Sequence, residues 1–211
     1  FIIIFASLFV VLLGVKNYED AKAQITALAD KNKIAASENI VGNFSFWLDE
    51  RLHSLVRAAK FMQNAGAIRD DEKLGDFIRL FKENSAEFDA LQFLREDGEI
   101  FVDGKELGDD EAMPKGLRTG LVWFEETKST LAPTVNFMQR HKILGEPTLN
   151  LCVPVMGGGS FAGVFCGVVK LQNILKNMEK FKLAPDSYAF IVTHGGEILT
   201  PMKDAALKKQ I

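Results

Sequence analysis

Several residue types that mark particular classes of protein are scarce in this chain. It has 2 cysteines and 6 prolines in 211 residues, and its net charge at pH 7 is −3. Two cysteines exclude a scaffold built from disulfides and argue against a cysteine-ligated zinc site. Lysine and arginine are not clustered, so the basic surface that nucleic-acid binding requires is missing. In contrast, 17 phenylalanines and a hydrophobic share of 47% exclude general disorder and provide for a full core.

Motifs for catalysis and metal binding are missing as well. The three histidines, His53, His141 and His194, fall on separate segments, whereas a shared metal site needs ligands at close spacing on one element. The triple glycine at 157–159 lacks the Gly-Lys-Thr ending and the following helix of a phosphate loop, so it predicts a hairpin turn. There is no nucleophile elbow, no Cys/His dyad and no pair of strand-end carboxylates. The sequence therefore predicts a protein that is not an enzyme and holds no cofactor or metal.

The first 15 residues, FIIIFASLFVVLLGV, carry no charge. A helix needs roughly 20 apolar residues to span a membrane, and this run falls short because the chain starts inside it. We predict that residues 1–15 are the end of a transmembrane helix. The alternatives are the core of a signal peptide and a buried helix, but no cleavage motif follows Val15.

A long amphipathic helix is predicted for residues 16–64. This segment has no proline, and apolar residues recur at spacings of three and four, among them Phe44, Trp47, Leu48 and Leu55. Some 45 helical residues would reach roughly 70 Å, which exceeds the width of a small domain. We therefore expect the C-terminal part to pack on a main core, and the polar, alanine-rich first third to lie against a partner helix or a small module. A simple coiled coil is the alternative, but the apolar spacing drifts.

The remaining chain alternates between helical and strand periodicity. Helices are predicted at 71–85 with an aspartate cap, directly after Trp123, and at 171–181. Strands are predicted at 88–94, 99–102, 134–143, 148–155 and 161–170, with turns at 97–98 and 157–159. A mostly antiparallel sheet with helices on its face is an α+β fold. The hairpin pattern recurs at 188–199, so we predict one complete module at 65–182 and the start of a second, truncated module at 183–211.

The glycine turn at 157–159 also sets a strand register. It places Cys152 opposite Cys166 and Asn150 opposite Val168 on one face of the sheet. A disulfide between directly opposed strand residues is geometrically awkward. We therefore expect the two cysteines to be small buried side chains, with a disulfide as the alternative in an oxidising compartment.

The order of these segments resembles the double-Cache extracytoplasmic sensor domain of bacterial methyl-accepting chemotaxis proteins and sensor kinases. The matching motifs are Val122-Trp123-Phe124 before a short helix, a strand TLNLCVPV, a strand FAGVFCGVV that enters a helix, and SYAFIV followed by GEIL. Their order and spacing match from about residue 17 to residue 200. The resemblance implies a long helix packed on a PAS-like antiparallel sheet, a membrane-distal module that binds a small ligand and a membrane-proximal module that relays the signal.

The resemblance also bears on the ligand. Family members that recognise amino acids carry an arginine two residues before the tryptophan, a tyrosine after it and an aspartate on the last distal strand. Arginine and aspartate there bind the carboxylate and ammonium of the ligand. This chain has Leu121, Phe124 and Val168 at these positions and keeps only Trp123. We therefore expect a small carboxylate or other metabolite in preference to a standard amino acid.

The predicted pocket combines the resemblance with the expected strand faces. Phe137, Gln139 and His141 share a face of the predicted strand, and the family alignment places Gln139 where a ligand-contacting tyrosine often lies. The candidate residues are Trp123, Phe124, Phe137, Gln139, His141, Asn150 and Val168, with Arg118 and Arg140 as anion contacts. The alternatives are that the aromatic pair only covers the sheet, that water or backbone satisfies the amides, and that both arginines are solvated.

We therefore predict the small-molecule sensing domain of a transmembrane chemoreceptor, periplasmic, anchored in the bacterial inner membrane and homodimeric through its long helix. Ligand binding would close the distal pocket and shift the sheet against that helix, which requires different affinities for two states. The sensor domain of a histidine kinase or cyclic-dinucleotide enzyme is the alternative within this class. A structural or assembly domain without a small-molecule ligand is the alternative from another class.

Overall fold

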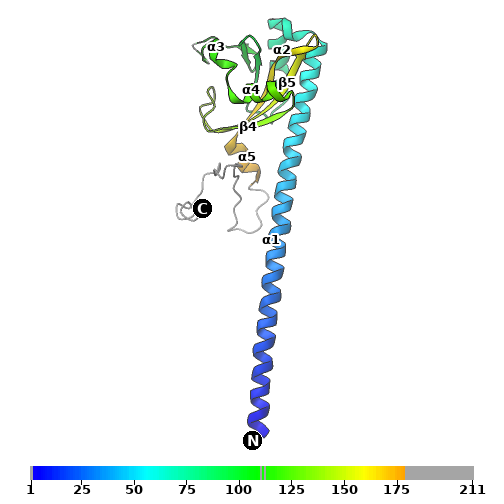
Figure 1. Cartoon of the computed structure of the whole chain (residues 1–211), viewed down its shortest axis with the longest axis vertical. Coiled ribbons are helices and arrows are strands. Elements are labelled where there is room, and N and C mark those ends of the chain that lie inside the picture. The colour runs from blue at the N-terminus through cyan, green and yellow to red at the C-terminus, as the bar shows by residue number, and fades with distance from the viewer. Residues whose placement is uncertain (1, 110, 112, 179–211) are drawn as a thin grey trace.

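The computed structural model describes residues 2–109, 111 and 113–178. Helix α1 (Ile2–Asn64) has 63 residues and extends far beyond the rest of the chain (Figure 1). At 1.5 Å per residue it is about 95 Å long, so the predicted long helix is confirmed. Large apolar side chains remain exposed along its N-terminal half, including those of Tyr18, Ile25 and Leu28. Within the described residues, no helix offers a stretch that is long and apolar enough to cross a membrane.

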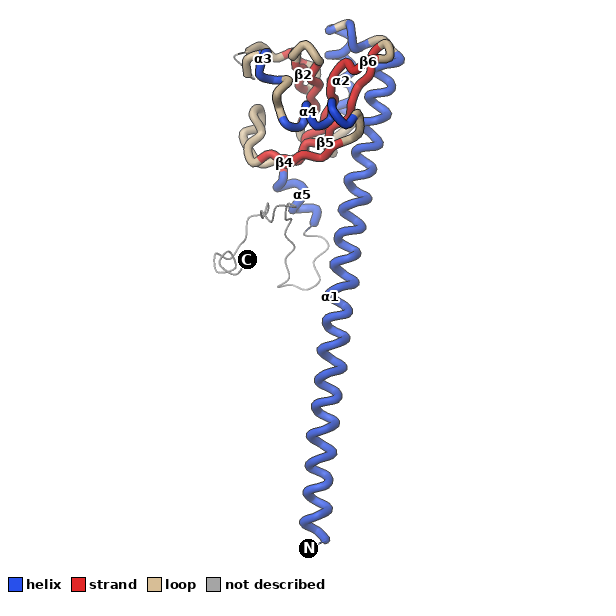
Figure 2. The backbone as a smooth tube through the Cα atoms, viewed as in Figure 1, coloured by secondary structure: helices blue, strands red, loops and turns tan. Residues whose placement is uncertain are grey.

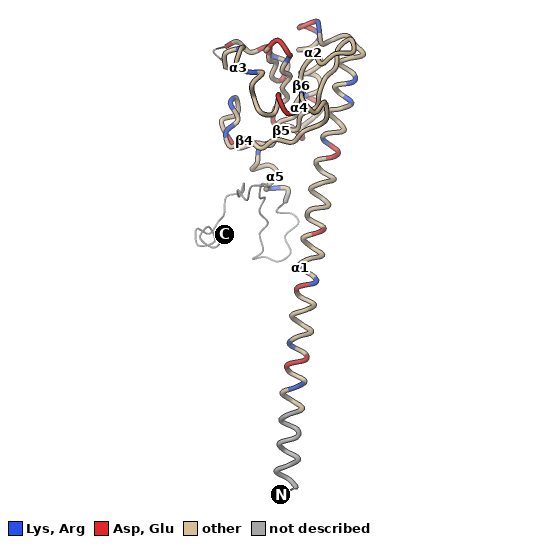
Figure 3. The backbone as a smooth tube through the Cα atoms, in the orientation of Figure 1, with Lys and Arg blue, Asp and Glu red and all other residues tan. Residues whose placement is uncertain are grey.

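Six strands form one antiparallel sheet in the order β3-β2-β1-β6-β5-β4 (Figure 2). They are β1 (Ala90–Arg95), β2 (Ile100–Val102), β3 (Lys105–Glu106), β4 (Thr134–Met138), β5 (Thr148–Gly157) and β6 (Ser160–Lys170). The two longest strands, β5 and β6, carry no charged residue except Lys170 at the end of β6 (Figure 3). Such continuously uncharged strands are typical of a sheet that is covered on both faces.

One face of the sheet is covered by α1 and α2 (Asp71–Glu83), which are joined by the short helix η1 (Ala67–Arg69). The last turns of α1 pack against β5 and β6 and bury Ala58, Ala59 and Met62 there. Helix α2 begins after Asp70, whose side chain accepts a hydrogen bond from the backbone N–H of Lys73 at 3.1 Å. This N-cap satisfies one of the free amide groups at the start of the helix, as the sequence predicted.

The opposite face carries α4 (Val122–Thr130) and the chain around it, including α3 (Lys115–Arg118). A second and smaller apolar cluster lies here, formed by Leu94, Ile100, Trp123, Phe124, Val164 and both cysteines. Because side chains alternate between the faces of a strand, neighbouring residues of β1 and β6 contribute to different clusters. Helix α5 (Leu171–Met178) follows β6 without a loop and lies below the sheet in Figure 1.

The α+β class, the hairpins β1–β2 and β5–β6, and the register of β5 with β6 agree with the predictions made from the sequence. Asn150 is paired with Val168, as predicted. The strand predicted at 134–143 is shorter, because β4 ends at Met138 and the backbone then turns, with the N–H of Gly145 donating to the carbonyl of His141 at 2.8 Å. The second hairpin at 188–199 and the truncated module at 183–211 lie outside the described residues.

The prediction that the two cysteines are separate buried side chains is wrong. Cys152 and Cys166 form a disulfide across β5 and β6, and both residues are fully buried. The predicted register was correct, and it brings the two Cα atoms within 4.1 Å. The prediction treated directly opposed strand residues as poorly placed for a disulfide. Directly opposed residues of antiparallel strands point to the same face of the sheet, and the bond forms there.

Removal of the disulfide should destabilise the folded domain. The bond joins residues with a sequence separation of 14. A disulfide that closes a loop of this size stabilises the folded state by roughly 3 kcal/mol, because it lowers the conformational entropy of the unfolded chain. We expect the Cys152→Ala/Cys166→Ala variant to show a lower free energy of unfolding by about that amount in urea titrations under non-reducing conditions. Dithiothreitol should lower the stability of the wild-type chain and leave that of the variant unchanged. Equal stability of the two oxidised chains would contradict the prediction.

Candidate functional site

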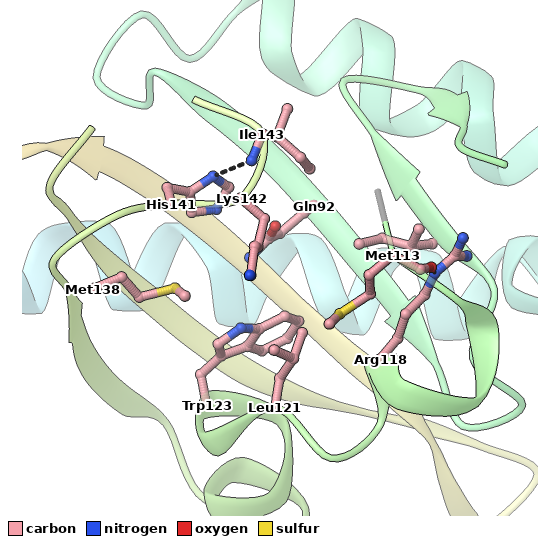
Figure 4. A pocket seen from close by; sticks show the side chains of 10 residues that line it. Gln92, Met113, Arg118, Leu121, Trp123, Met138, His141, Lys142 and Ile143 are labelled. Atoms are coloured by element: carbon pink, nitrogen blue, oxygen red, sulfur yellow. Dashed lines mark hydrogen bonds between the residues drawn. The ribbon is translucent and has the colours of Figure 1, made fainter. Parts of the chain in front are cut away.

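A small cavity lies on the sheet face opposite α1, between the sheet and the segments around α3 and α4 (Figure 4). Its volume is about 30 Å³, enough for two or so water molecules at roughly 10–15 Å³ each. It is lined by side chains from β1, β2, β4, the two helices and the connecting loops: Gln92, Ile100, Met113, Arg118, Leu121, Trp123, Met138, His141, Lys142 and Ile143.

Trp123 forms one wall of the cavity and is held in place from several sides. The residue is 3% exposed, and its indole meets the ring of Phe124 edge to face at 6.1 Å. Its carbonyl accepts a hydrogen bond from the Thr127 hydroxyl at 2.7 Å, and that hydroxyl in turn contacts the hydroxyl of Thr134 on β4 at 2.6 Å. The first turn of α4 is thereby fixed to the sheet, and the indole stands in a defined position.

His141 lies in residues 139–147, the loop between β4 and β5, which we call the β4–β5 loop. Its Nδ1 atom lies 3.3 Å from the backbone nitrogen of Ile143 and 3.3 Å from that of Leu144, and accepts from both. Burial lowers the pKa of His141 from 6.5 to about 4. The ring is therefore neutral at pH 7, and because Nδ1 is an acceptor, the proton is on Nε2. His141 thus presents one N–H donor beside the cavity.

Gln92 is the polar residue of the cavity that comes from the centre of the sheet. It lies on β1, opposite Cys166 of β6 and Val102 of β2, and is 2% exposed. Its amide nitrogen Nε2 is buried and has no hydrogen-bond partner among the residues that the structure describes. A buried donor without a partner costs about 1–3 kcal/mol, so its presence in a cavity wall is unusual.

Two cationic side chains complete the cavity, and they differ in their availability. Arg118 is 3% exposed, and each of its three guanidinium nitrogens already donates within the protein, at 2.7 Å to the carbonyl of Met113, at 3.1 Å to that of Gly98 and at 3.0 Å to Asp109 Oδ1. Its guanidinium points away from the centre of the cavity (Figure 4). Lys142 is exposed, and its side chain runs over the cavity toward Trp123 (Figure 4). Arg118 therefore anchors the surrounding loops, whereas the Lys142 ammonium can reach an occupant.

The β4–β5 loop is also tied to the start of α5. Glu146 Oε1 lies 2.7 Å from the Lys170 ammonium, and Glu146 Oε2 accepts from the Gln172 amide at 2.9 Å. The backbone N–H of Leu171 donates to the carbonyl of Pro147 at 2.9 Å. The loop that contributes His141 and Lys142 to the cavity is therefore connected directly to the first residues of α5.

The structure brings together only part of the predicted set. Trp123, His141 and Arg118 line the cavity. Phe124, Asn150 and Val168 are fully buried but lie outside the cavity lining. Phe137 packs against the core beneath α1, and Gln139 and Arg140 are exposed. Met138, and not Phe137, lines the cavity. Phe137 is paired with Leu149, which belongs to the core beneath α1, and side chains alternate along a strand, so Met138 points to the opposite face.

Sequence reasoning missed Gln92, Met113, Met138 and Lys142 as cavity residues. The signal for Gln92 was available, since it is the one uncharged polar residue within the apolar run Ala90–Leu94. Strand alternation could have placed it on the same face as Cys166 once the β1–β6 pairing was known. Met113 and Lys142 come from loops, whose paths no periodicity predicts.

Comparisons with solved structures place this fold among the ligand-binding domains of bacterial chemoreceptors. The ligand-binding domain of the Pseudomonas aeruginosa PAO1 amino acid chemoreceptor PctB in complex with L-Gln matches with a TM-score of 0.64 and 22% identity over 80% of this chain and 66% of that chain. The Pseudomonas fluorescens chemoreceptor CtaA with L-isoleucine matches with 0.63 and 21%, over 81% of this chain and 66% of that chain. The P. aeruginosa PctC domain with GABA matches with 0.62 and 20%, over 84% and 79%.

The chain thus spans about two thirds of the length of the first two domains. No protein-family model and no curated protein matches it. The predicted resemblance to Cache-type sensor domains is confirmed at the level of the fold.

The predicted preference for a small carboxylate or other metabolite over a standard amino acid is wrong. It conflicts with these neighbours, whose structures hold L-Gln, L-isoleucine and GABA. The prediction weighed only the family positions occupied here by Leu121, Phe124 and Val168. His141 was among the predicted pocket residues but was not weighed in the choice of ligand, and Gln92 of β1, which lines the same cavity, was not considered.

The buried imidazole of His141 should make the domain lose stability in mild acid. The unfolded chain binds a proton at this residue near pH 6.5, and the folded chain does so at about 4. Between these values the unfolded state holds more protons, so stability falls as the pH drops, by about 3 kcal/mol in all. We expect urea titrations at pH 7, 6, 5 and 4 to show this loss. In His141→Asn, whose Oδ1 can still accept from the loop, the loss attributable to this residue should disappear. Parallel pH curves for the two chains would contradict the assignment.

Proposed function

We propose that this chain is the extracytoplasmic small-molecule sensor of a membrane-anchored chemoreceptor and that its ligand is a small amino acid or a close analogue such as GABA. The observation that carries the proposal is the cavity beside Trp123, where buried polar donors and apolar side chains meet on the sheet face away from α1. The shared fold supports the same class, because its neighbours are chemoreceptor domains with amino acids or GABA bound. This role is that of a binding module and not of an enzyme.

We divide the chain into four parts. Residues 65–182 form the membrane-distal module with the ligand site, 16–64 form the signalling helix, 1–15 are the end of a transmembrane helix and 183–211 begin a membrane-proximal module. The continuity of α1 from Ile2 to Asn64 supports the assignments of the distal module and of the signalling helix, because one helix then joins the sheet to the uncharged N-terminal run. Such a helix can transmit a displacement over its whole length.

Two further observations support the cellular setting and the oligomeric state. Disulfides persist in oxidising compartments, so the buried bond between Cys152 and Cys166 favours an extracytoplasmic domain, which for a chemoreceptor is the periplasmic side of the inner membrane. The exposed apolar side chains of Tyr18, Ile25 and Leu28, at spacings of seven and three residues, lie on one side of α1 and favour a parallel homodimer through this helix.

We assign the first step of signal transmission to the β4–β5 loop. The cavity is small, about 30 Å³, and Lys142 of the β4–β5 loop runs over it, so we expect the loop to shift when an amino acid binds. Glu146 joins this loop to Lys170 and Gln172 at the start of α5. The movement therefore reaches α5, which leads toward the proximal module. A ligand can drive it only by binding the two loop positions with different affinity.

The ligand assignment is tested by a thermal-shift screen of the 211-residue chain in detergent against the twenty L-amino acids and GABA. A ligand at 100 times its dissociation constant should add roughly 2.7 kcal/mol and raise the unfolding midpoint by several degrees. The shift should be lost in Trp123→Ala, because this side chain forms one cavity wall. It should persist in Phe46→Ala, a matched loss of an exposed aromatic residue on α1. No shift with any compound, for a chain that unfolds cooperatively, would favour the structural or assembly role.

The transmission step is tested by hydrogen–deuterium exchange with the amino acid that gives the largest thermal shift. In the wild-type chain, ligand should slow exchange in residues 139–147 and also in α5. In Glu146→Ala, which removes the side-chain contacts to Lys170 and Gln172 and keeps the hydrogen bond from Leu171 to the Pro147 carbonyl, we expect weaker slowing of exchange in α5 than in the wild type, with the loop still slowed and ligand affinity within about threefold. Glu126→Ala serves as the control, because it removes an exposed glutamate of α4 and should preserve both effects. Protection of α5 in Glu146→Ala equal to that in the wild type would refute this route.

A further inference from the structure

We infer that the carboxylate of the ligand is bound by two neutral donors, the Gln92 amide and the His141 Nε2–H, with the Lys142 ammonium beside them, and not by an arginine. This inference rests on the proposed function and names how its cavity selects the ligand.

The first argument is the polarity of the cavity wall. Among its lining residues, Gln92, Trp123, His141 and Lys142 carry side-chain N–H donors, and none of the lining residues is an aspartate or a glutamate. The one remaining basic residue, Arg118, donates one hydrogen bond from each of its three nitrogens to a protein oxygen, and its guanidinium points away from the centre of the cavity (Figure 4). An occupant therefore meets donors that need acceptors, and a carboxylate supplies up to four acceptor positions in a small volume.

The second argument is the unpaired amide of Gln92. Its Nε2 atom is buried and has no partner in the described part of the chain, so the empty domain bears a desolvation cost at this atom. A ligand oxygen that accepts from Nε2 would remove this cost. A hydrogen bond to a charged acceptor contributes more than one to a neutral acceptor, which favours a carboxylate over an amide or alcohol.

The third argument is the fixed tautomer of His141. Two backbone N–H groups of the β4–β5 loop, those of Ile143 and Leu144, hold Nδ1 as an acceptor. Nε2 is therefore a donor whatever the ligand, and the ring lies on the same side of the cavity as Gln92 (Figure 4). Trp123 forms the opposite wall in this view and offers an aromatic face to the ligand's ammonium group.

The test is isothermal titration calorimetry on the full chain in detergent with L-glutamine, L-isoleucine and GABA, and with L-glutaminamide and L-isoleucinamide, which lack the carboxylate. For the acid that binds most tightly, we expect Gln92→Leu to weaken binding 10- to 100-fold and His141→Asn about 10-fold. Gln92→Glu, which places a second carboxylate there, should abolish binding. The amides should bind at least 10-fold more weakly than their parent acids.

Matched controls separate ligand contact from a general loss of packing. Thr148→Val removes a fully buried polar group outside the cavity, and Lys60→Met removes an exposed positive charge on α1. Both should leave the dissociation constant within twofold, whereas Lys142→Met should raise it about three- to tenfold. The unfolding midpoint of each ligand-free variant confirms that it is folded, and Gln92→Met provides a second apolar replacement of similar length should Gln92→Leu fail to fold.

The outcomes distinguish this inference from the function on which it rests. Tight binding of an amino acid that Gln92→Leu, Gln92→Met and His141→Asn leave unchanged, or equal binding of acid and amide, overturns the inference and keeps the sensor function. Absence of binding by the wild-type chain to all twenty L-amino acids and GABA overturns both.

Discussion

The antiparallel pairing of β5 with β6 is the constraint on which the rest of the domain depends. These strands have almost no charge, each pairs with a neighbour on both sides, and the Cys152–Cys166 disulfide joins them. Their register decides which residues face α1 and which face the cavity, because alternate side chains point to opposite faces. A shift by one residue would exchange the two sets, and the disulfide prevents such a shift.

The two faces of the sheet consequently have different tasks. The face under α1 and α2 is a tightly packed aliphatic and aromatic core, to which alanines on α1 allow close approach. The other face has a smaller core and carries buried polar groups, including Gln92, Thr127, Thr134 and Asn150. Thr127, Thr134 and Asn150 are hydrogen-bonded within the protein, whereas the Gln92 amide nitrogen has no partner in the described residues. The larger apolar core therefore lies on the helix side of the sheet, and these buried polar groups lie on the cavity side.

The cavity side of the sheet is also connected to α5. The residues that line the cavity include ones from a central strand, from α4 and from the β4–β5 loop, and this loop lies outside the sheet. Glu146 and Pro147 connect that loop to α5, so occupancy of the cavity and the position of α5 share a short path of hydrogen bonds. Helix α1 lies on the far side of the sheet, where its last turns pack against β5 and β6.

Much of the architecture was determined by the sequence alone. Apolar spacing and the lack of proline define the long helix, alternation and glycine turns define the hairpins, and the turn at 157–159 fixes the register of Cys152 with Cys166. These features depend on neighbours in sequence, where periodicity is informative. Only the tertiary structure decided that the two cysteines are bonded, that Met138 and not Phe137 faces the cavity, and that Gln92 meets His141 there. The disulfide depends on the spacing of two strands, and the orientation of Met138 depends on how β4 pairs with β5. Gln92 and His141 lie on segments about fifty positions apart. No local sequence pattern encodes these relations.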